Sequence, residues 1–355
     1  MSNKNDRFHQ LMDQLELEGI LLTSFENIRY LTGFSGSNAL VYVTRQDTFL
    51  WTDQRYEIQS QQQSPQCKID ISREAIKQFN AKKIKETLTG KVGFESDSLT
   101  VSEFDFYKSA AGSVEWIPLG NEILQIRAVK TSEEIVLLKE AIRRADCAFS
   151  KVLPYVKEGI SEVELKVELE YLMAKEGHEG AAFGTIVAFG ERAALPHAIP
   201  TARKLKRGEM ALIDFGLNYE GYMSDMTRTI KFGPIANEES TIFDLTLNAL
   251  EASIDAVASG VKLSDLDEIH RSLFRKAGVE KYSLRGLGHG VGLQIHEYPR
   301  VVEKGPGALE ENMVFTIEPG LYFPDRYGVR IEDIVLVDSS GCEVLTQTPR
   351  EICLG

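Results

Sequence analysis

The first 120 or so residues alternate between helical segments and short apolar runs. Leu11, Leu15 and Leu17 predict a short helix that ends at Gly19, and residues 56–63 predict a second helix. Runs of β-branched and aromatic residues predict strands over 20–23, 41–44, 48–52, 92–94 and 114–117. Such alternation indicates a sheet with helices packed on its faces, and therefore a small α/β domain.

The pattern changes between residues 122 and 131, where long helical stretches begin. Helices are predicted over 131–151, 161–177, 241–258 and 264–276. The first two begin with Thr or Ser followed three residues later by Glu, the spacing of a capping box. Short strands with acidic residues lie between the helices. We therefore predict two domains, 1–122 and 123–355, the second α+β with outer helices and an inner antiparallel sheet.

Composition excludes several classes of protein. A formal net charge of -13 argues against nucleic acid or an anionic membrane as the main partner. The four cysteines are widely spaced with no CxxC pair, which argues against a zinc ribbon and indicates reduced thiols. We find no signal peptide and no apolar run of the roughly 18 residues that a membrane span requires. We expect a soluble cytoplasmic protein.

Five candidate metal ligands follow one another in the last 140 or so residues: Asp214, Asp225, His289, Glu318 and Glu332. The carboxylates lie among apolar, β-forming residues, where burying a lone charge is costly. Four neighbouring carboxylates need compensation, and two divalent cations would balance their four negative charges. One neutral imidazole completes the set. The acidic residues also form two pairs, each on a predicted hairpin, which could face each other across a pseudo-twofold axis.

These motifs resemble the metallopeptidases of the pita-bread fold, namely methionine aminopeptidase, prolidase and Xaa-Pro aminopeptidase. The resemblance covers essentially the whole chain and implies that the five residues bind two metal ions. It also implies that Asp225 and Glu332 bridge both ions. Residues 27–36 and 51–56 look like the N-terminal domain of the creatinase, prolidase and Xaa-Pro aminopeptidase group. This domain counts against methionine aminopeptidase, and the complete ligand set counts against creatinase.

The ligand chemistry narrows the choice of metal. Four carboxylates and one imidazole suit Mn²⁺, Co²⁺ or Fe²⁺, and Zn²⁺ also accepts such ligands. Since the resemblance points to manganese or cobalt, we predict Mn²⁺. Two such ions share a water, lower its pKa and provide hydroxide for attack on a peptide carbonyl.

The resemblance also assigns catalytic roles. His197 and His296 match the catalytic histidines of the family, and we expect them to contact the substrate carbonyl and the oxyanion. Glu318 is expected to carry a proton from the water to the leaving amine. Arg330 is expected to orient the metal carboxylates. Arg300 is a candidate clamp for a substrate carboxylate, with an ordinary ion pair as the alternative.

The remaining histidines, His9, His178 and His270, are expected to be non-functional. Segments around residues 34–37 and 51–56 look closer to Xaa-Pro aminopeptidases than to prolidases. We therefore expect an enzyme that cleaves the Xaa-Pro bond at the N-terminus of peptides, with an Xaa-Pro dipeptidase as the alternative. A non-catalytic pita-bread binding module is a more remote alternative. The resemblance further implies a homodimer.

Overall fold

The computed structural model describes residues 4–177 and 179–355, so His178 lies outside the described residues. Contacts within the chain divide it into two compact units, residues 1–127 and 128–355. The sequence placed the boundary at 122/123, inside the first turn of α6 (Asn121–Ala128). The compact units instead divide after Arg127, because α6 packs with the first unit: Ile123 is buried, and Arg127 donates a hydrogen bond of 2.8 Å to Asn27 Oδ1.

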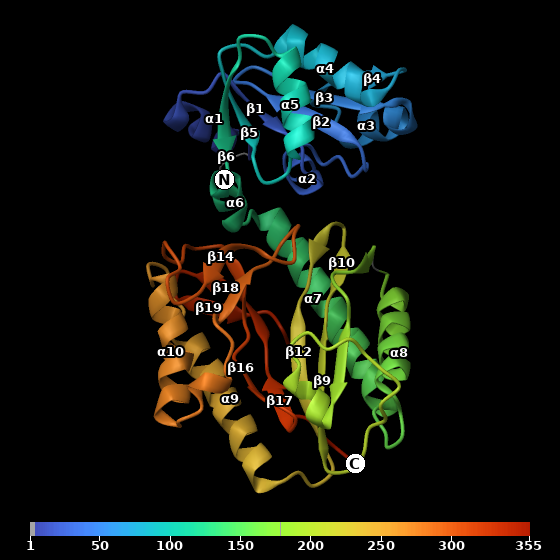
Figure 1. Cartoon of the computed structure of the whole chain (residues 1–355), viewed down its shortest axis with the longest axis vertical. Coiled ribbons are helices and arrows are strands. Elements are labelled where there is room, and N and C mark those ends of the chain that lie inside the picture. The colour runs from blue at the N-terminus through green and yellow to red at the C-terminus, as the bar shows by residue number, and fades with distance from the viewer. Residues whose placement is uncertain (1–3, 178) are drawn as a thin grey trace. The chain divides into compact units, whose positions relative to one another are not determined.

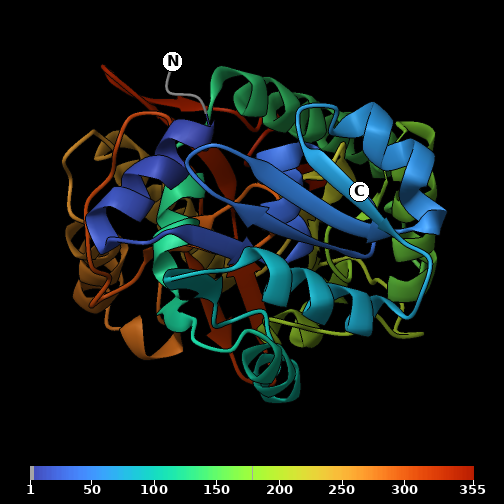
Figure 2. The ribbon, with the colours of Figure 1, turned by 90° about the horizontal axis from the view of Figure 1, so that it is seen from above.

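The first unit is a six-stranded mixed sheet with the order β4-β3-β2-β1-β5-β6. Its strands are β1 (Gly19–Leu22), β2 (Ala39–Val43), β3 (Thr48–Asp53), β4 (Lys68–Ser72), β5 (Lys91–Glu95) and β6 (Glu115–Leu119). Its helices are α1 (Lys4–Leu15), α2 (Phe25–Thr32), α3 (Glu57–Gln63), α4 (Ile76–Thr87), α5 (Val101–Ala110) and α6. Helices lie on both sides of the sheet, as Figure 2 shows. Leu21 and Tyr42 pair across β1 and β2 and pack with Trp51 and Phe79 on one face.

The second unit consists of two helix pairs that cover inner sheets (Figure 1). The helices are α7 (Ser132–Val152), α8 (Glu162–Lys175), α9 (Asn237–Asp255) and α10 (Leu263–Lys276). The strands are β7 (Gly180–Ala181), β8 (Ile186–Phe189), β9 (Glu209–Phe215), β10 (Leu217–Tyr219), β11 (Tyr222–Met223), β12 (Met226–Phe232), β13 (Gly288–Gly290), β14 (Glu297–Val301), β15 (Val314–Ile317), β16 (Gly320–Phe323), β17 (Tyr327–Arg330), β18 (Asp333–Asp338), β19 (Gly341–Val344) and β20 (Cys353–Leu354).

Each helix pair packs on its own sheet. One core joins α7 and α8 to the sheet β20-β12-β9-β8, through stacked rings such as Phe149 and Phe215. The other joins α9 and α10 to the sheet β14-β13-β15-β18-β19 and to the hairpin β16–β17. Named strands in the described part of this unit pair antiparallel, apart from β12 with β20. The predicted fold, an α+β unit preceded by a smaller α/β unit, is confirmed.

None of the helices in the described part of the chain combines the length and the hydrophobicity that a span across a bilayer requires.

Candidate metal centre

The five predicted ligands come from the inner strands of the second unit. Asp214 lies on β9 and His289 on β13. Asp225, Glu318 and Glu332 do not lie inside strands: each occupies a two-residue break, between β11 and β12, β15 and β16, and β17 and β18 respectively. A break frees the side chain from the strict up-and-down alternation of a strand. Both predicted acidic pairs flank hairpins, since β10–β11 separates the aspartates and β16–β17 separates the glutamates.

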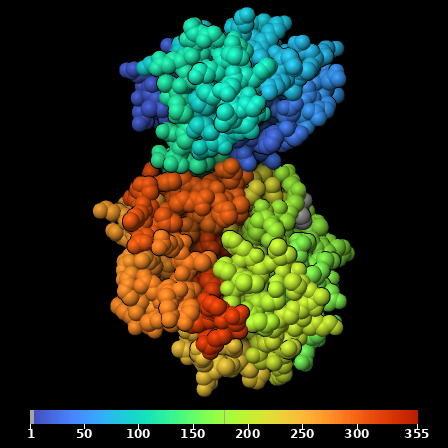
Figure 3. All heavy atoms as spheres, in the orientation of Figure 1, coloured from blue at the N-terminus to red at the C-terminus, as the bar shows by residue number. Residues whose placement is uncertain are grey.

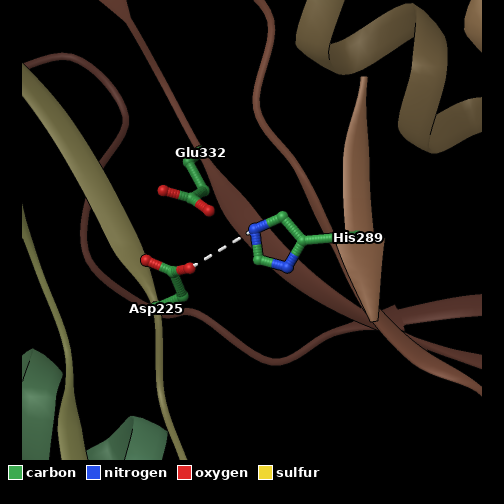
Figure 4. Close-up of side chains that lie close together, drawn as sticks. All are labelled: Asp225, His289 and Glu332. Carbon is green, nitrogen blue, oxygen red and sulfur yellow. Dashed lines mark ion pairs between the residues drawn. The ribbon is translucent and has the colours of Figure 1, made fainter. Parts of the chain in front are cut away.

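The ligand atoms converge. Asp225, His289 and Glu332 each offer one atom that lies within 4.8 Å of the others (Figure 4). His289 Nε2 is 3.7 Å from Asp225 Oδ2 and 3.2 Å from Glu318 Oε1. Asp214 accepts a hydrogen bond from Arg330, and Asp214 Oδ1 has no hydrogen-bond partner among the described residues. The same holds for Glu332 Oε1 within that part of the chain.

Two glycines allow His289 to reach this position. A Cβ on Gly288 would lie 1.9 Å from the Thr316 carbonyl oxygen, and one on Gly290 would lie 2.2 Å from that of Tyr298. Only glycine therefore lets β13 approach its two neighbours so closely. His289 Nδ1 is 3.1 Å from the Gly290 carbonyl oxygen, which favours a proton on Nδ1 and leaves the Nε2 lone pair facing the carboxylates.

Burial dominates the electrostatics of the carboxylates. Burial, followed by repulsion from neighbouring carboxylates, raises the pKa of Asp225 and of Glu332 well above the ordinary values. Burial also raises the pKa of Asp214, against the attraction of Arg330. For Glu318, burial acts upward, but the contact with His289 and the charge of Arg330 lower the pKa overall. Buried carboxylates with raised pKa values are poised for a cation that replaces their protons.

The residues present fit divalent cations. The donor set contains four carboxylates and one imidazole, and it contains no sulfur. Such donors suit Mn²⁺, Co²⁺, Fe²⁺ or Zn²⁺. The two buried oxygens without hydrogen-bond partners are natural positions for metal contacts, because an orphaned buried carboxylate oxygen is costly. These residues could therefore hold a metal.

Arg330 connects the centre to its surroundings. Its guanidinium is buried and donates to Asp214, to the Tyr322 hydroxyl at 2.5 Å and to Thr227 Oγ1 at 2.9 Å. A further bond of 3.3 Å reaches the Pro196 carbonyl oxygen. One planar cation thus orients a ligand carboxylate and touches the segment that carries His197.

A cavity of about 560 Å³ opens over the centre. The nine predicted site residues all line it: His197, Asp214, Asp225, His289, His296, Arg300, Glu318, Arg330 and Glu332. Figure 3 shows the hollow between the yellow-green and the orange parts of the second unit. The rings of His289 and His296 pack edge to face with centroids 4.3 Å apart. Burial lowers the pKa of His296, and the neighbouring His289 imidazole and Arg300 guanidinium lower it further.

The cavity lining excludes two of the remaining histidines and includes three residues that the sequence did not indicate. His9, which lies 3.2 Å from the Thr44 carbonyl oxygen, and His270, buried in α10, do not line the cavity. Lys166, Arg285 and Tyr322 do line it, although the sequence did not single them out. No motif in the sequence around these three residues indicates a role at the site, because they meet the other lining residues only in the folded chain.

Comparison with known proteins identifies the family. Residues 136–339 match the model of metallopeptidase family M24, and residues 4–129 match that of the creatinase/prolidase N-terminal domain. The chain belongs to metallopeptidase family M24. The predicted family resemblance is confirmed, and the protein is a metallopeptidase, so the non-catalytic binding module is excluded.

Relatives of this metallopeptidase match over nearly the whole chain. The Xaa-Pro dipeptidase of Pyrococcus furiosus is 33% identical over 356 residues, covering 99% of this chain and 100% of the relative. The structure of an Xaa-Pro dipeptidase from Bacillus anthracis is similar with a TM-score of 0.95 and 36% identity, covering 99% of both chains. An X-Pro aminopeptidase from Thermotoga maritima has a TM-score of 0.89 and 33% identity, covering 97% of this chain and 100% of that one.

Proposed function

We propose that this metallopeptidase is an Xaa-Pro dipeptidase that binds two divalent cations. The observation that carries the proposal is that the five candidate ligands line one cavity, with three of them clustered closely, together with two histidines and an arginine. The names of the Pyrococcus furiosus and Bacillus anthracis relatives favour a dipeptidase over the aminopeptidase that the sequence led us to expect first. The aminopeptidase stays the second candidate, because the Thermotoga maritima structure carries that name.

The residues that would hold the two cations are Asp214, Asp225, His289, Glu318 and Glu332. Two divalent cations would supply hydroxide near neutral pH and polarise the scissile carbonyl, and the donor set supports manganese as the metal. The Mn²⁺ assignment is tested by the metal content of the protein and by the reactivation of chelated protein with single metals.

The chain's own residues then have distinct tasks. Glu318, 3.2 Å from His289, takes the proton of the nucleophilic water and passes it to the departing proline nitrogen. His197 and His296 line the cavity as donors to the substrate carbonyl and to the oxyanion that forms from it. The lowered pKa of His296 supports a neutral imidazole in this role. Arg330 holds Asp214 in place.

Arg300 bears on the length of the substrate. It lines the cavity and is exposed, so its guanidinium can pair with the free carboxylate of a dipeptide. A longer peptide presents an amide at that position, which offers no charge to pair. We propose that this clamp makes the enzyme selective for dipeptides.

The deciding experiment compares an Xaa-Pro dipeptide with an Xaa-Pro-Yaa tripeptide, using the purified full chain with added Mn²⁺. We expect turnover of the dipeptide and little of the tripeptide, and Arg300→Ala should narrow that gap. Equal or faster cleavage of the tripeptide would replace the dipeptidase by the aminopeptidase.

Variants test the catalytic roles. Glu318→Gln and His296→Ala should lower turnover by orders of magnitude while the circular dichroism spectrum is kept. His9→Gln is a matched control, because His9 lies outside the cavity. A near wild-type rate in the Glu318 or the His296 variant would refute its proposed role. The homodimer and the cytoplasmic location stay predictions; light scattering and cell fractionation test them.

A further inference from the structure

The segment that carries His197 has little structure of its own. Between β8 and β9 it contains a short 3-10 turn, η3 (Gly190–Ala194), followed by irregular backbone. This backbone meets the start of α8, where the Val163 N–H donates to the Thr201 carbonyl oxygen at 3.1 Å and the Glu162 N–H to that of Arg203 at 3.0 Å. His197 is exposed, and its neighbour Ile199 is 81% exposed. Ala193 and Ala198 of this segment are buried against β8 and β9, but a side chain that points into solvent gains no such order from packing. Something else must therefore fix the histidine if it is to meet a substrate in a defined position.

A single buried carboxylate holds both ends of this segment. Glu162, in the first turn of α8, is fully buried. Its Oε1 accepts from the Phe189 backbone N–H and Arg192 Nε, both at 3.0 Å. Its Oε2 accepts from Arg192 Nε at 3.0 Å, from the Thr201 backbone N–H at 2.8 Å and from Thr201 Oγ1 at 2.7 Å. Five contacts thus converge on one side chain, from residues before and after His197.

Two guanidinium groups extend the contacts of Glu162 to the residues next to His197. Arg192, itself paired with Glu162, donates to the Ile199 carbonyl oxygen at 2.6 Å. Arg330 donates to the Pro196 carbonyl oxygen at 3.3 Å and also to Asp214. The backbone on either side of the histidine is therefore tied to α8 on one side and to the metal carboxylates on the other.

Glu162 is not needed to start the helix. The capping box of α8 consists of Ser161 and Glu164, whose carboxylate accepts from the Ser161 backbone N–H at 2.8 Å. A buried ion pair is also weak evidence for stability, because desolvation offsets most of its attraction. The five contacts of Glu162 are thus better explained by the geometry that they impose on the segment.

We propose that Glu162 is a positioning residue for the peptidase reaction: with Arg192 and Thr201 it fixes the segment 189–201 so that His197 faces the metal centre. This inference rests on the role proposed for His197.

The test combines exchange and kinetics in the full-length enzyme with Mn²⁺. In Glu162→Gln, an amide group replaces one acceptor oxygen and faces donors, so several of the five contacts are lost. Hydrogen–deuterium exchange over residues 189–201 should become faster, and kcat for an Xaa-Pro dipeptide should fall about 10- to 100-fold, because displacement by about 1 Å costs on the order of 100-fold. Bound Mn²⁺ should be unchanged.

A double-mutant cycle separates positioning from general damage. In the His197→Ala background, Glu162→Gln should cause no further loss of kcat, because its effect passes through the histidine. Thr201→Val removes the hydroxyl contact with Glu162, and the bond that this hydroxyl accepts from the Arg203 N–H, but keeps the backbone contact with Glu162. It is therefore a milder variant that should slow turnover less and through the same histidine. Glu164→Gln is the matched control on the same helix, and it should retain wild-type exchange and kcat.

Each outcome is decisive. Wild-type exchange over 189–201 in both Glu162→Gln and Thr201→Val would overturn the proposal, as would additive losses with His197→Ala. If Glu162→Gln does not fold, the Thr201→Val exchange and cycle decide. If the wild-type enzyme does not cleave Xaa-Pro dipeptides, the proposed function fails. Faster exchange of the segment in both variants would then still support the proposal that Glu162 holds it in place.

Discussion

Removal of divalent cations should destabilise the second unit measurably. The centre contains four carboxylates against one buried guanidinium, so with a neutral His289 its net charge is about -3, and two divalent cations change this to about +1. A cation present at 100 times its dissociation constant stabilises the folded state by about 2.7 kcal/mol per site. For a unit of about 230 residues, 1 kcal/mol shifts Tm by roughly 2–4 °C. Saturating Mn²⁺ should therefore raise Tm by about 5–10 °C per site.

The assay is thermal unfolding of chelated protein during titration with Mn²⁺, followed by circular dichroism. Asp225→Asn and Glu332→Gln provide a second test of the cation site, because each removes a buried negative charge that its neighbours repel. Both variants should melt at a higher temperature than the wild type without metal, and both should lose most of the response to Mn²⁺. Equal Tm values for chelated and Mn²⁺-saturated wild type would refute the view that these carboxylates form a cation site.

Four further substitutions test other parts of the structure. Arg330→Lys should weaken Mn²⁺ binding about 10- to 100-fold by metal titration, because one ammonium cannot replace a planar fork with four partners. Gly288→Ala should cost about 1–3 kcal/mol or more in urea unfolding, because its Cβ would lie 1.9 Å from the Thr316 carbonyl oxygen; wild-type stability would contradict the close approach of β13. Burial lowers the pKa of His270 from 6.5 to about 4. Between these pH values the unfolded chain binds more protons than the folded chain, so acidification lowers the free energy of unfolding. His270→Phe should recover about 2 kcal/mol of the stability that is lost between pH 7 and pH 5. Burial raises the pKa of Asp267 to about 6, so its protonation in the folded chain has the opposite effect and supports stability at acid pH. Asp267→Asn should therefore steepen the loss of stability on acidification. Unchanged pH profiles of stability in both variants would contradict these assignments.

The helices α7 and α8 of the second unit were predictable because their start signals are local. The capping boxes at 131–134 and 161–164 are present in the structure, and α7 and α8 begin within them. In the first unit, α5 also has a capping box, at Thr100 and Glu103, which the alternation of apolar runs did not bring out. By contrast, α4 begins after Ala75 without any side-chain cap, so its sequence offers no comparable signal.

The identity of the site residues was predictable, but their local structure was only partly so. The sequence placed the acidic residues on strands, whereas Asp225, Glu318 and Glu332 lie in breaks between strands. One break has a visible cause: Pro319 follows Glu318, and a proline cannot donate a hydrogen bond to a sheet. The break at Glu332 depends on a strand that is distant in the sequence, because Glu332 N donates to the Thr227 carbonyl oxygen, a contact over 105 residues.

Two buried glutamates that support the site, Glu162 and Glu134, occupy positions where the helical pattern predicts an apolar residue. In α8, Glu162 lies in phase with the buried stripe of Leu165, Leu169 and Leu172, where an apolar side chain is expected. A charge in that position must find buried partners or it would be too costly to keep, and its partners here lie 27 to 39 residues further along the chain. Glu134 repeats the arrangement at the start of α7: it is buried and accepts a 2.9 Å hydrogen bond from Tyr222, three residues before Asp225. In both helices an acid in phase with the apolar stripe ties a loop of the site to a rigid element, so a misplaced charge in a helical pattern predicts where a site is held, even though its partners appear only in the fold.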